Sequence, residues 1–274
     1  MAELRAVILV DNIGNEQLKG EWGLSIYLEF REKKILLDAG ASGLFLKNAS
    51  RLGIVLADVD YAVLSHAHYD HANGMPDFFA VNQKARLYLQ SCCGENCYGR
   101  KNWMFKKYIG ISKGMLAEYA DRFQLVSGRE NIMDGVELLP HNTDGLKKLG
   151  KLNHLYIKQS GIYQADNFAH EQSLILHTKD GIVILNSCSH GGIDTILRET
   201  RTAFPRKKIL ALGGGFHLYH MSDHAVKNFA EQLLEADVKK VYTGHCTGER
   251  AFRVMKDTLG SRVEQFHVGL EINL

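Results

Sequence analysis

Apolar and polar positions alternate with a period of two in several short segments of this chain. An apolar run at Arg5–Asp11 predicts a first strand, and Leu24–Phe30 alternates before a polar turn and a second apolar segment, Ile35–Asp38. Two such segments around a short polar turn are typical of a β-hairpin. The same arrangement returns at Leu174–Thr178 and Ile182–Leu185, so the sequence predicts a second hairpin in its other half.

Other segments have helical spacing of their apolar residues or form short apolar runs. Helices are predicted over Ser42–Leu52, Asn73–Asn82, Ile193–Phe204, Ala225–Ala236 and Glu249–Leu259. Strands are predicted over Tyr61–Ser65, Arg86–Gln90, Phe123–Val126, Val136–Leu139, Lys208–Leu212, Val238–Thr243 and Val263–Ile272. Residues from about 91 to 120 are the least regular, and we interpret them as an irregular insertion.

The two halves of the chain follow a similar order of hairpin, helix and strand. Two similar halves of this kind predict two mixed sheets packed face to face with helices outside, an α/β (α+β) four-layer αββα sandwich. The length of 274 residues, with 45% hydrophobic and 23% charged residues, fits a single globular domain over residues 1–274.

Charge and cysteine usage narrow the class of protein. The formal net charge is +2 and no long basic run occurs, so binding to nucleic acid is unlikely on this pattern. No apolar stretch has the length of a membrane span, and the N-terminus lacks the pattern of a signal peptide. The five cysteines are odd in number and unevenly clustered, which favours a reducing compartment, and we expect a cytoplasmic protein. The oligomeric state stays open.

The segment His66-Ala-His68-Tyr-Asp70-His71 carries the strongest chemical signal. It directly follows the predicted strand Tyr61–Ser65, so imidazoles and a carboxylate lie at the rim of a sheet. Zn²⁺ and Fe²⁺ prefer such nitrogen and oxygen donors. In an extended chain, His66 and His68 can point to the same side, while Asp70 and His71 can serve a second ion after the chain turns.

Three later strands also end in metal-capable or polar side chains. The relevant segments are Asn186-Ser-Cys188-Ser-His190, Gly213-Gly-Gly-Phe-His217-Leu-Tyr-His220 and Thr243-Gly-His245-Cys246. Ligands in layered α/β folds are typically bound at such strand ends. The sequence therefore predicts one site built from several strand ends.

On these residues the chain resembles the metallo-β-lactamase superfamily. The His66-x-His68-x-Asp70-His71 pattern is similar to the signature of that superfamily, and Leu36-Leu-Asp38-Ala-Gly40 resembles its strand with a buried aspartate. The segments around His190, His217 and His245 resemble a branch of dihydropterin–ribofuranosylaminobenzene-phosphate synthase-like proteins and other metal-dependent hydrolases. The resemblance covers essentially the whole chain.

The resemblance implies a centre with two divalent ions, Zn²⁺ first and Fe²⁺ or Mn²⁺ as alternatives. His66 and His68 would bind the first ion, and Asp70, His71 and His245 would bind the second. Common members place a bridging aspartate at the end of the second hairpin, but here that position holds Cys188, with His190 two residues later.

The usual third histidine also has no clear counterpart in this chain. We therefore assign His190 as the remaining metal ligand, with Cys188, His170 and Glu171 as alternatives. Asp38 is predicted to orient a ligating histidine rather than to bind metal itself. Cys188 is thus either a metal ligand or a neighbour of one.

Two further histidines and three cysteines are candidates for other roles. His217 is predicted to lie near the site, where it could bind an anionic substrate or transfer a proton, and His220 could also contact substrate. Cys92, Cys93 and Cys97 lack a fourth thiolate at the spacing of an iron–sulfur cluster, so we interpret them as reduced thiols in a loop that borders the pocket. The aromatic and basic stretch 98–108 either covers the active site or is a surface excursion.

These residues predict a metal-dependent hydrolase that acts on a small anionic ester, phosphoester or lactone. Metal ions would activate water, and Asp70 would bind metal and orient the nucleophile. Either His217 or a metal-bound water would protonate the leaving group. The alternatives are a synthase-like transferase, as the branch resemblance implies, and a di-iron redox protein. A non-catalytic metal-binding protein is disfavoured because structural sites are usually closed by four protein ligands.

Overall fold

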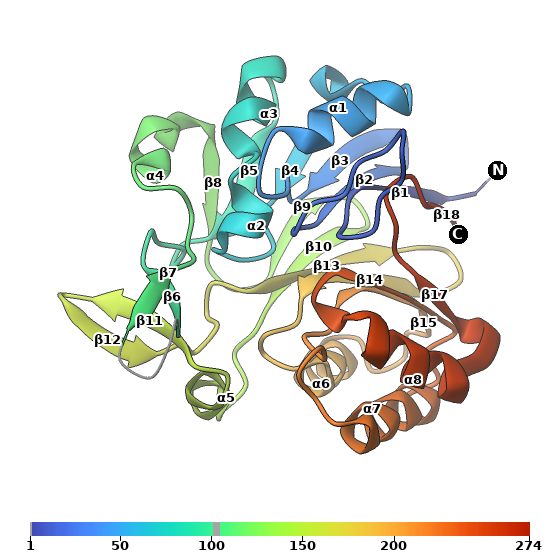
Figure 1. Ribbon diagram of the computed structural model, residues 1–274. Coiled ribbons are helices and arrows are strands. Elements are labelled where there is room, and N and C mark those ends of the chain that lie inside the picture. The colour runs from blue at the N-terminus through green and yellow to red at the C-terminus, as the bar shows by residue number, and fades with distance from the viewer. Residues whose placement is uncertain (1, 101–104) are drawn as a thin grey trace.

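The computed structural model describes residues 2–100 and 105–274. Its core is two seven-stranded sheets that face each other (Figure 1). In the order of the strands across it, the first sheet contains β18 (Glu271–Asn273), β1 (Leu4–Val10), β2 (Ser25–Phe30), β3 (Lys33–Leu37), β4 (Tyr61–Val63), β5 (Arg86–Gln90) and β8 (Phe123–Val126). The second contains β17 (Val263–Gln265), β16 (Lys240–Thr243), β15 (Ile209–Gly215), β14 (Ile182–Cys188), β13 (Gln172–His177), β10 (Val136–Pro140) and β9 (Glu130–Met133).

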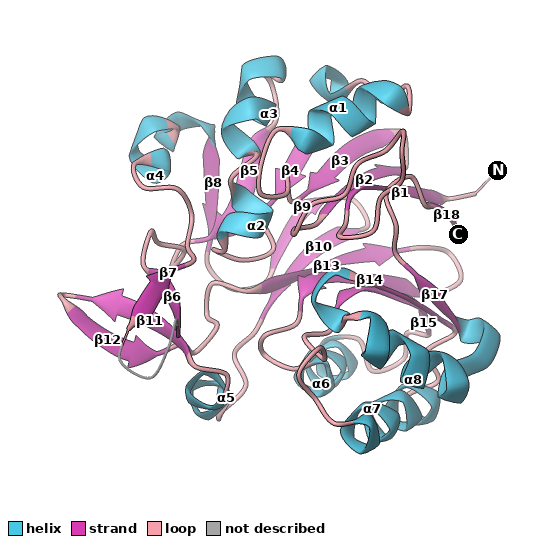
Figure 2. Cartoon of the chain, viewed as in Figure 1, coloured by secondary structure: helices cyan, strands magenta, loops and turns pink. Residues whose placement is uncertain are grey.

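Helices cover the outer face of each sheet (Figure 2). The first sheet is covered by α1 (Leu44–Arg51), α2 (Tyr69–Ala72), α3 (Met75–Val81) and α4 (Met115–Glu118), and the second by α6 (Ile193–Ala203), α7 (Asp223–Glu235) and α8 (Glu249–Leu259). One buried apolar cluster lies between the sheets and includes Ile8, Leu28 and Leu174. Separate clusters hold the helices to the sheets. The predicted four-layer αββα sandwich is confirmed.

The strand directions explain why candidate side chains meet at one edge. The strands β3, β4, β5 and β8 are parallel neighbours in the first sheet, as are β14, β15, β16 and β17 in the second. Parallel strands bring their carboxyl ends to the same edge of a sheet. Asp38 follows β3, His66 follows β4 soon after its end, Cys188 ends β14 and His245 follows β16.

Both predicted hairpins are confirmed, as antiparallel pairs β2–β3 and β13–β14. The predicted closing strand Val263–Ile272 is wrong as one element. It is divided into β17 and β18, which belong to different sheets. The chain passes between the sheets at Gly269, whose φ of +89° is a conformation that glycine adopts readily, and the amide of Gly269 donates to the carbonyl of Ile8.

The stretch 91–120 is more regular than its sequence pattern indicates. It contains β6 (Cys97–Arg100) and β7 (Lys106–Tyr108), which pair with each other. β6 also pairs with β11 (Leu155–Gln159), and β11 pairs with β12 (Ile162–Ala165), so the four strands form a third sheet. This small sheet stands at one side of the sandwich, next to α5 (Leu146–Leu152) (Figure 1). Trp103 and the rest of 101–104, which belong to the predicted aromatic and basic cover, lie outside the described residues.

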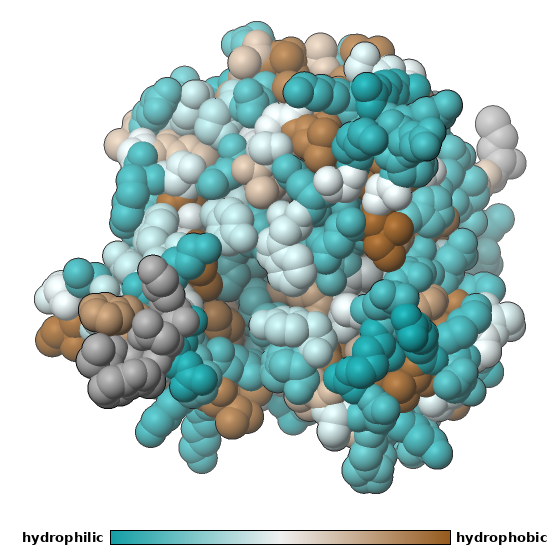
Figure 3. Space-filling model, viewed as in Figure 1, coloured by the Kyte–Doolittle hydropathy of each residue, from teal (hydrophilic) through white to brown (hydrophobic). Residues whose placement is uncertain are grey.

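The helices and the surface complete the description of the fold. Within the described ranges, no helix combines the length and the apolar character needed to cross a membrane. The face shown in Figure 3 is mainly hydrophilic, with hydrophobic residues in small groups.

Gly214 in β15 can be used to test how closely the backbones of β14 and β15 approach each other. Its φ is +145°, and a Cβ atom there would lie 1.6 Å from the carbonyl oxygen of Asn186 in the neighbouring strand. We expect Gly214→Ala to destabilise the protein by at least about 3 kcal/mol in urea unfolding, because backbone must move. Gly161→Ala is the control, since Gly161 also has a positive φ but open space around it, and should cost only about 1–2 kcal/mol. Equal losses for the two variants would contradict the clash.

Candidate metal centre

Asp38 organises the first group of candidate ligands. Its carboxylate is fully buried and accepts hydrogen bonds from the Ser65 amide, the Ser65 hydroxyl and Nδ1 of His71, each over 2.7 Å. Since the Ser65 hydroxyl donates to Asp38, its oxygen is left to accept from Nδ1 of His66, 2.8 Å away. His66 and His71 therefore each carry a proton on Nδ1, so that Nε2 is the nitrogen that can offer a lone pair to a metal.

His71 and His245 meet through these lone pairs. Nδ1 of His245 lies 3.2 Å from the side-chain oxygen of Asn12 and donates to it, so Nε2 of His245 is also unprotonated. The two Nε2 atoms are 3.3 Å apart, and the Asp70 carboxylate lies 3.5 Å from that of His245 and 4.0 Å from that of His71. Two lone pairs and a carboxylate so close together repel one another unless a proton or a metal cation lies among them. This arrangement fits a divalent ion.

His66, His68 and His190 form a second group of donors. Each offers one ligand atom, and these atoms lie within 4.8 Å of one another. The Nε2 atoms of His66 and His68 and both ring nitrogens of His190 are buried with no hydrogen-bond partner. A buried polar atom without a partner is costly, and a metal ion would satisfy it. The structure therefore brings His190 to the first pair of ligands predicted from the sequence.

The electrostatics of these rings suit metal binding. Burial, together with neighbouring imidazoles, holds the pKa of His66 and His190 well below the usual range. Burial also lowers the pKa of His68 and of His245 to about 3. The four rings are therefore neutral at pH 7, which is the form that binds a metal.

Cys188 lies between the two groups of ligands. Its sulfur is within 4.8 Å of donor atoms of His66 and His71, and in other combinations it groups with His190 and His217 or with His245 and Cys246. The two sulfurs of Cys188 and Cys246 are 3.0 Å apart, and both residues are buried. The position between the groups is where a bridging ligand would be expected, so Cys188 stays a candidate ligand.

His217 and His220 lie on the open side of the centre. The ring centroid of His217 is 4.5 Å from that of His190, and that of His220 is 5.3 Å from that of His217. His217 lines both a cavity of about 370 Å³, which also exposes His68 and Asp70, and a larger pocket of about 830 Å³. His220 lines only the larger pocket, so it lies farther from the predicted ligands than His217 does.

An aromatic residue forms part of the rim of the smaller cavity. Trp22 lies with its ring centroid 4.9 Å from that of His245 and 6.5 Å from that of Tyr219. Its side chain is 48% exposed, so the indole stands between solvent and the second group of ligands.

Three candidate residues hold a strained backbone. Asp38, His217 and His245 have φ values of 59°, 53° and 46°, in the left-handed region that favours glycine. Such a conformation costs on the order of 1–3 kcal/mol for other residues and persists only where the surroundings enforce it. At His245 the surroundings include Asp11, whose buried carboxylate accepts the His245 amide over 2.8 Å.

His170 and Glu171, which the sequence leaves as further candidates for the missing ligand, do not group with His66 and His190. Nε2 of His170 contacts Asp166 and Cys97, and its ring centroid is 5.6 Å from that of His68. Glu171 accepts the backbone amide of His190 over 3.1 Å and lies 3.4 Å from Nε2 of His141. Glu171 therefore contacts the backbone of the His190 loop.

Glu171 gives a pH-dependent stability that can be measured. Burial raises its pKa from 4.5 to about 7, although His141 and backbone amides act in the opposite direction. The folded state then binds more protons than the unfolded state between these values, so stability falls as pH rises through this window. In metal-free protein, Glu171→Gln should remove up to about 3 kcal/mol of this fall. Urea unfolding at pH 4.5 and pH 7.5 tests this, and an unchanged slope would contradict it.

Sequence reasoning missed the residues that support His245. Asp11 and Asn12 follow β1 and bond to His245, and Cys246 contacts Cys188. A signal was present for Asp11, because a carboxylate at the end of an apolar strand is the same pattern that identified Asp38. Its partner lies 234 residues away along the chain, which no local pattern reveals.

Comparisons with known proteins agree with this geometry. The family model described as the metallo-β-lactamase superfamily matches residues 23–90, which include Asp38 and the whole histidine cluster. A curated relative from Methanocaldococcus jannaschii, named 7,8-dihydropterin-6-methyl-4-(beta-D-ribofuranosyl)-aminobenzene-5'-phosphate synthase, is 24% identical over 93% of this chain and 90% of its own length. An uncharacterised protein of the same organism is 25% identical over 89% of this chain and 91% of its own length.

Solved structures show the same fold. A crystal structure described as a metal-dependent hydrolase of the β-lactamase superfamily has a TM-score of 0.85 and 28% identity, with 99% of each chain covered. A diphosphatase from the PhnP family has a TM-score of 0.55 and 14% identity over 99% of this chain and 98% of its own, which supports the fold alone. The family model over residues 23–90 and these structures together show that the chain is similar to the metallo-β-lactamase superfamily, both in the segment that carries Asp38 and His66–His71 and in its fold.

Proposed function

We propose that this protein is a metal-dependent hydrolase with a centre for two divalent ions. The observation that carries the proposal is the set of buried, neutral imidazole nitrogens that lack hydrogen-bond partners. His66, His68 and His190 would hold one ion, and the remaining ligands Asp70, His71 and His245 the other. The donor set of imidazoles and a carboxylate favours Zn²⁺, with Fe²⁺ or Mn²⁺ as alternatives.

The metal ions and the side chains of the protein would have different roles in the reaction. When bound, such ions lower the pKa of coordinated water and stabilise negative charge that develops on the substrate. Asp70 would bind metal and accept a hydrogen bond from the attacking water. His217 lines the cavity next to His190 and would give a proton to the leaving group.

The pockets support a small anionic ester, phosphoester or lactone as substrate. The reacting group would enter the cavity of about 370 Å³ that contains His68, Asp70 and His245. The adjoining pocket of about 830 Å³ is lined by apolar residues such as Phe216 and Phe229 and by Arg198, and could hold the rest of the substrate. His220 lines this pocket and would contact the substrate there.

The five free cysteines support a reducing compartment, for which we propose the cytoplasm.

A metal and substrate screen tests the proposal. The purified protein is stripped of metal, reloaded with Zn²⁺, Mn²⁺ or Fe²⁺, and assayed with phosphodiester, phosphomonoester and lactone substrates. Metal-dependent hydrolysis of one of these classes supports the proposal. Full metal loading without hydrolysis of any class would contradict it.

A synthase-like transferase is the second candidate. It is favoured by the relative named as a dihydropterin-linked phosphate synthase and by the size of the larger pocket, which could hold two substrates. Incubation of loaded protein with a dihydropterin and a ribofuranosylaminobenzene phosphate, followed by mass spectrometry, separates the two candidates. A condensed product would favour the transferase over the hydrolase.

A further inference from the structure

A second cluster of metal-capable side chains lies where the small sheet meets the sandwich. Cys97, Asp166, His170 and His68 each offer one ligand atom, and these atoms lie within 4.8 Å of one another. All four residues are buried. They come from β6, from the end of β12, from the segment before β13 and from the residue that precedes α2.

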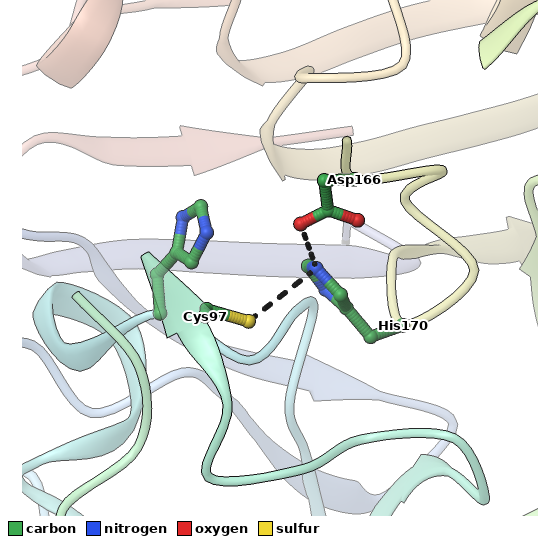
Figure 4. Close-up of side chains that lie close together, drawn as sticks. Cys97, Asp166 and His170 are labelled. Atoms are coloured by element: carbon green, nitrogen blue, oxygen red, sulfur yellow. Dashed lines mark hydrogen bonds and ion pairs between the residues drawn. The ribbon is translucent and has the colours of Figure 1, made fainter. Parts of the chain in front are cut away.

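The side chains converge on one nitrogen of His170. Its Nε2 lies 3.0 Å from the Asp166 carboxylate and 3.7 Å from the sulfur of Cys97 (Figure 4). The other carboxylate oxygen of Asp166 accepts the Phe168 amide over 2.8 Å, which fixes the carboxylate in this orientation. In a catalytic Cys–His–Asp arrangement the thiol and the carboxylate contact opposite nitrogens of the ring. Here both contact the same nitrogen, so the cluster is not built as a triad.

We propose that Cys97, Asp166 and His170 bind a third divalent ion, with His68 as the fourth donor shared with the active centre. Thiolate, carboxylate and imidazole are all ligands of Zn²⁺, and four protein ligands without an open position are typical of a structural site. The buried Nε2 of His68 has no hydrogen-bond partner. This one atom can serve only one of the two sites, so the other site would take Nδ1 of the same ring. An imidazole binds a metal through each of its two nitrogens only as an imidazolate, so His68 would also release its remaining N–H proton when both sites are loaded.

Binding of Zn²⁺ would change the protonation of the ligands at this site. Zn²⁺ would displace the thiol proton of Cys97 and the remaining N–H proton of His68 to solvent, and Asp166 would bind as the carboxylate. His170 must present a lone pair at Nε2, so its proton moves to Nδ1, which now accepts the Ala67 amide over a long 3.3 Å. Loading therefore breaks the bond from Ala67, the residue between His66 and His68.

The role of this ion would be to hold the small sheet against the sandwich. Residues Gly99 and Arg100 of β6 and Leu155 of β11 line the cavity of the active centre. The ligands join this sheet to the segments that carry His68 and β13. The third ion would thereby fix one wall of the cavity without taking part in the reaction.

Metal counting and cobalt spectroscopy test the site. Full-length protein is stripped with a chelator and titrated with Zn²⁺ and Co²⁺, and bound metal is counted by mass spectrometry. We expect Cys97→Ser and Asp166→Asn to bind about one ion fewer per chain than the wild type. Cys92→Ser is the matched control, because the Cys92 thiol lies in the loop just before β6 but is exposed and donates to the Ala169 carbonyl. It should bind as many ions as the wild type.

The thiolate-to-cobalt charge-transfer band identifies the ligand. The band should be lost or strongly reduced in Cys97→Ser and retained in Cys188→Ser, whose sulfur lies at the active centre. His190→Ala should lower the count but leave the Cys97-dependent band, so failure of the active centre is distinguishable from failure of this site.

Two outcomes of these measurements would contradict a third metal site. Equal metal counts and equal bands in wild type and Cys97→Ser would overturn the inference and leave a metal-free hydrogen-bonded cluster. Zinc X-ray absorption of a Cys188→Ser/Cys246→Ser variant, which lacks both sulfurs at the active centre, gives a second measurement that needs no Cys97 variant to fold. A zinc–sulfur shell there supports the site, and only nitrogen and oxygen neighbours would refute it.

Discussion

Replacing His190 with alanine is expected to lower metal-dependent hydrolysis by at least about 10³-fold, or roughly 4 kcal/mol of transition-state stabilisation. The ring is buried, neutral and without a hydrogen-bond partner, and its donor atom lies with those of His66 and His68. Loss of the ring removes a ligand of one ion, so the expected effect falls on kcat and on metal content together. Steady-state kinetics and metal analysis of the same preparation measure both.

His224→Ala is the matched control for this experiment. His224 is exposed on α7, where its ring contacts Asn228 within the same helix. Its removal should leave kcat and metal content at the wild-type level. A His190→Ala protein with full metal content and wild-type kcat would refute the ligand assignment and favour the alternative, Cys188, as the missing ligand.

Asp38→Ala is expected to have the second large effect. It would leave the Ser65 amide, the Ser65 hydroxyl and Nδ1 of His71 buried without their acceptor. Removal of one partner from such a buried network typically costs about 3–5 kcal/mol of stability. Loss of a residue that orients metal ligands also lowers metal affinity by roughly 10–100-fold. Urea unfolding of metal-free protein and a competitive chelator titration measure the two effects separately.

An exposed aspartate serves as control. Asp58 forms a surface ion pair with Lys34 over 2.9 Å, and its side chain is 55% exposed. Exposed pairs of this kind contribute at most about 1 kcal/mol, so Asp58→Ala should change stability little and metal affinity not at all. Wild-type metal affinity in a folded Asp38→Ala protein would show that Asp38 does not orient the ligands.

The features that the sequence predicted well are those set by local patterns. The hairpins, most helices and the cluster from His66 to His71 depend on periodicity and on residues close together in the chain. In the sequence, His190 was identified only because it lies two residues after Cys188, which occupies the position of the bridging aspartate in common family members. The structure brings His190 to His66 and His68. Its role as a ligand remains a prediction.

The features that the sequence did not predict depend on contacts between distant segments. The small sheet forms because β6 pairs with β11, so Cys97 lies near Asp166 and His170 only in the folded chain. The period-two pattern within 91–120 is too short to predict its strands. The change of sheet within Val263–Ile272 depends on a glycine conformation and on a bond to Ile8, neither of which periodicity encodes.

Trp22 lies close enough to the centre for its fluorescence to report metal binding there. The chain has two tryptophans, and the other, Trp103, lies outside the described residues. In a Trp103→Phe variant the emission comes from Trp22 alone, whose ring lies 4.9 Å from that of His245. Binding of a paramagnetic ion such as Co²⁺ to His245 should quench this fluorescence, whereas an ion at Cys97 should change it much less. Occupancy of the two regions can thus be followed separately in solution, before any substrate is known.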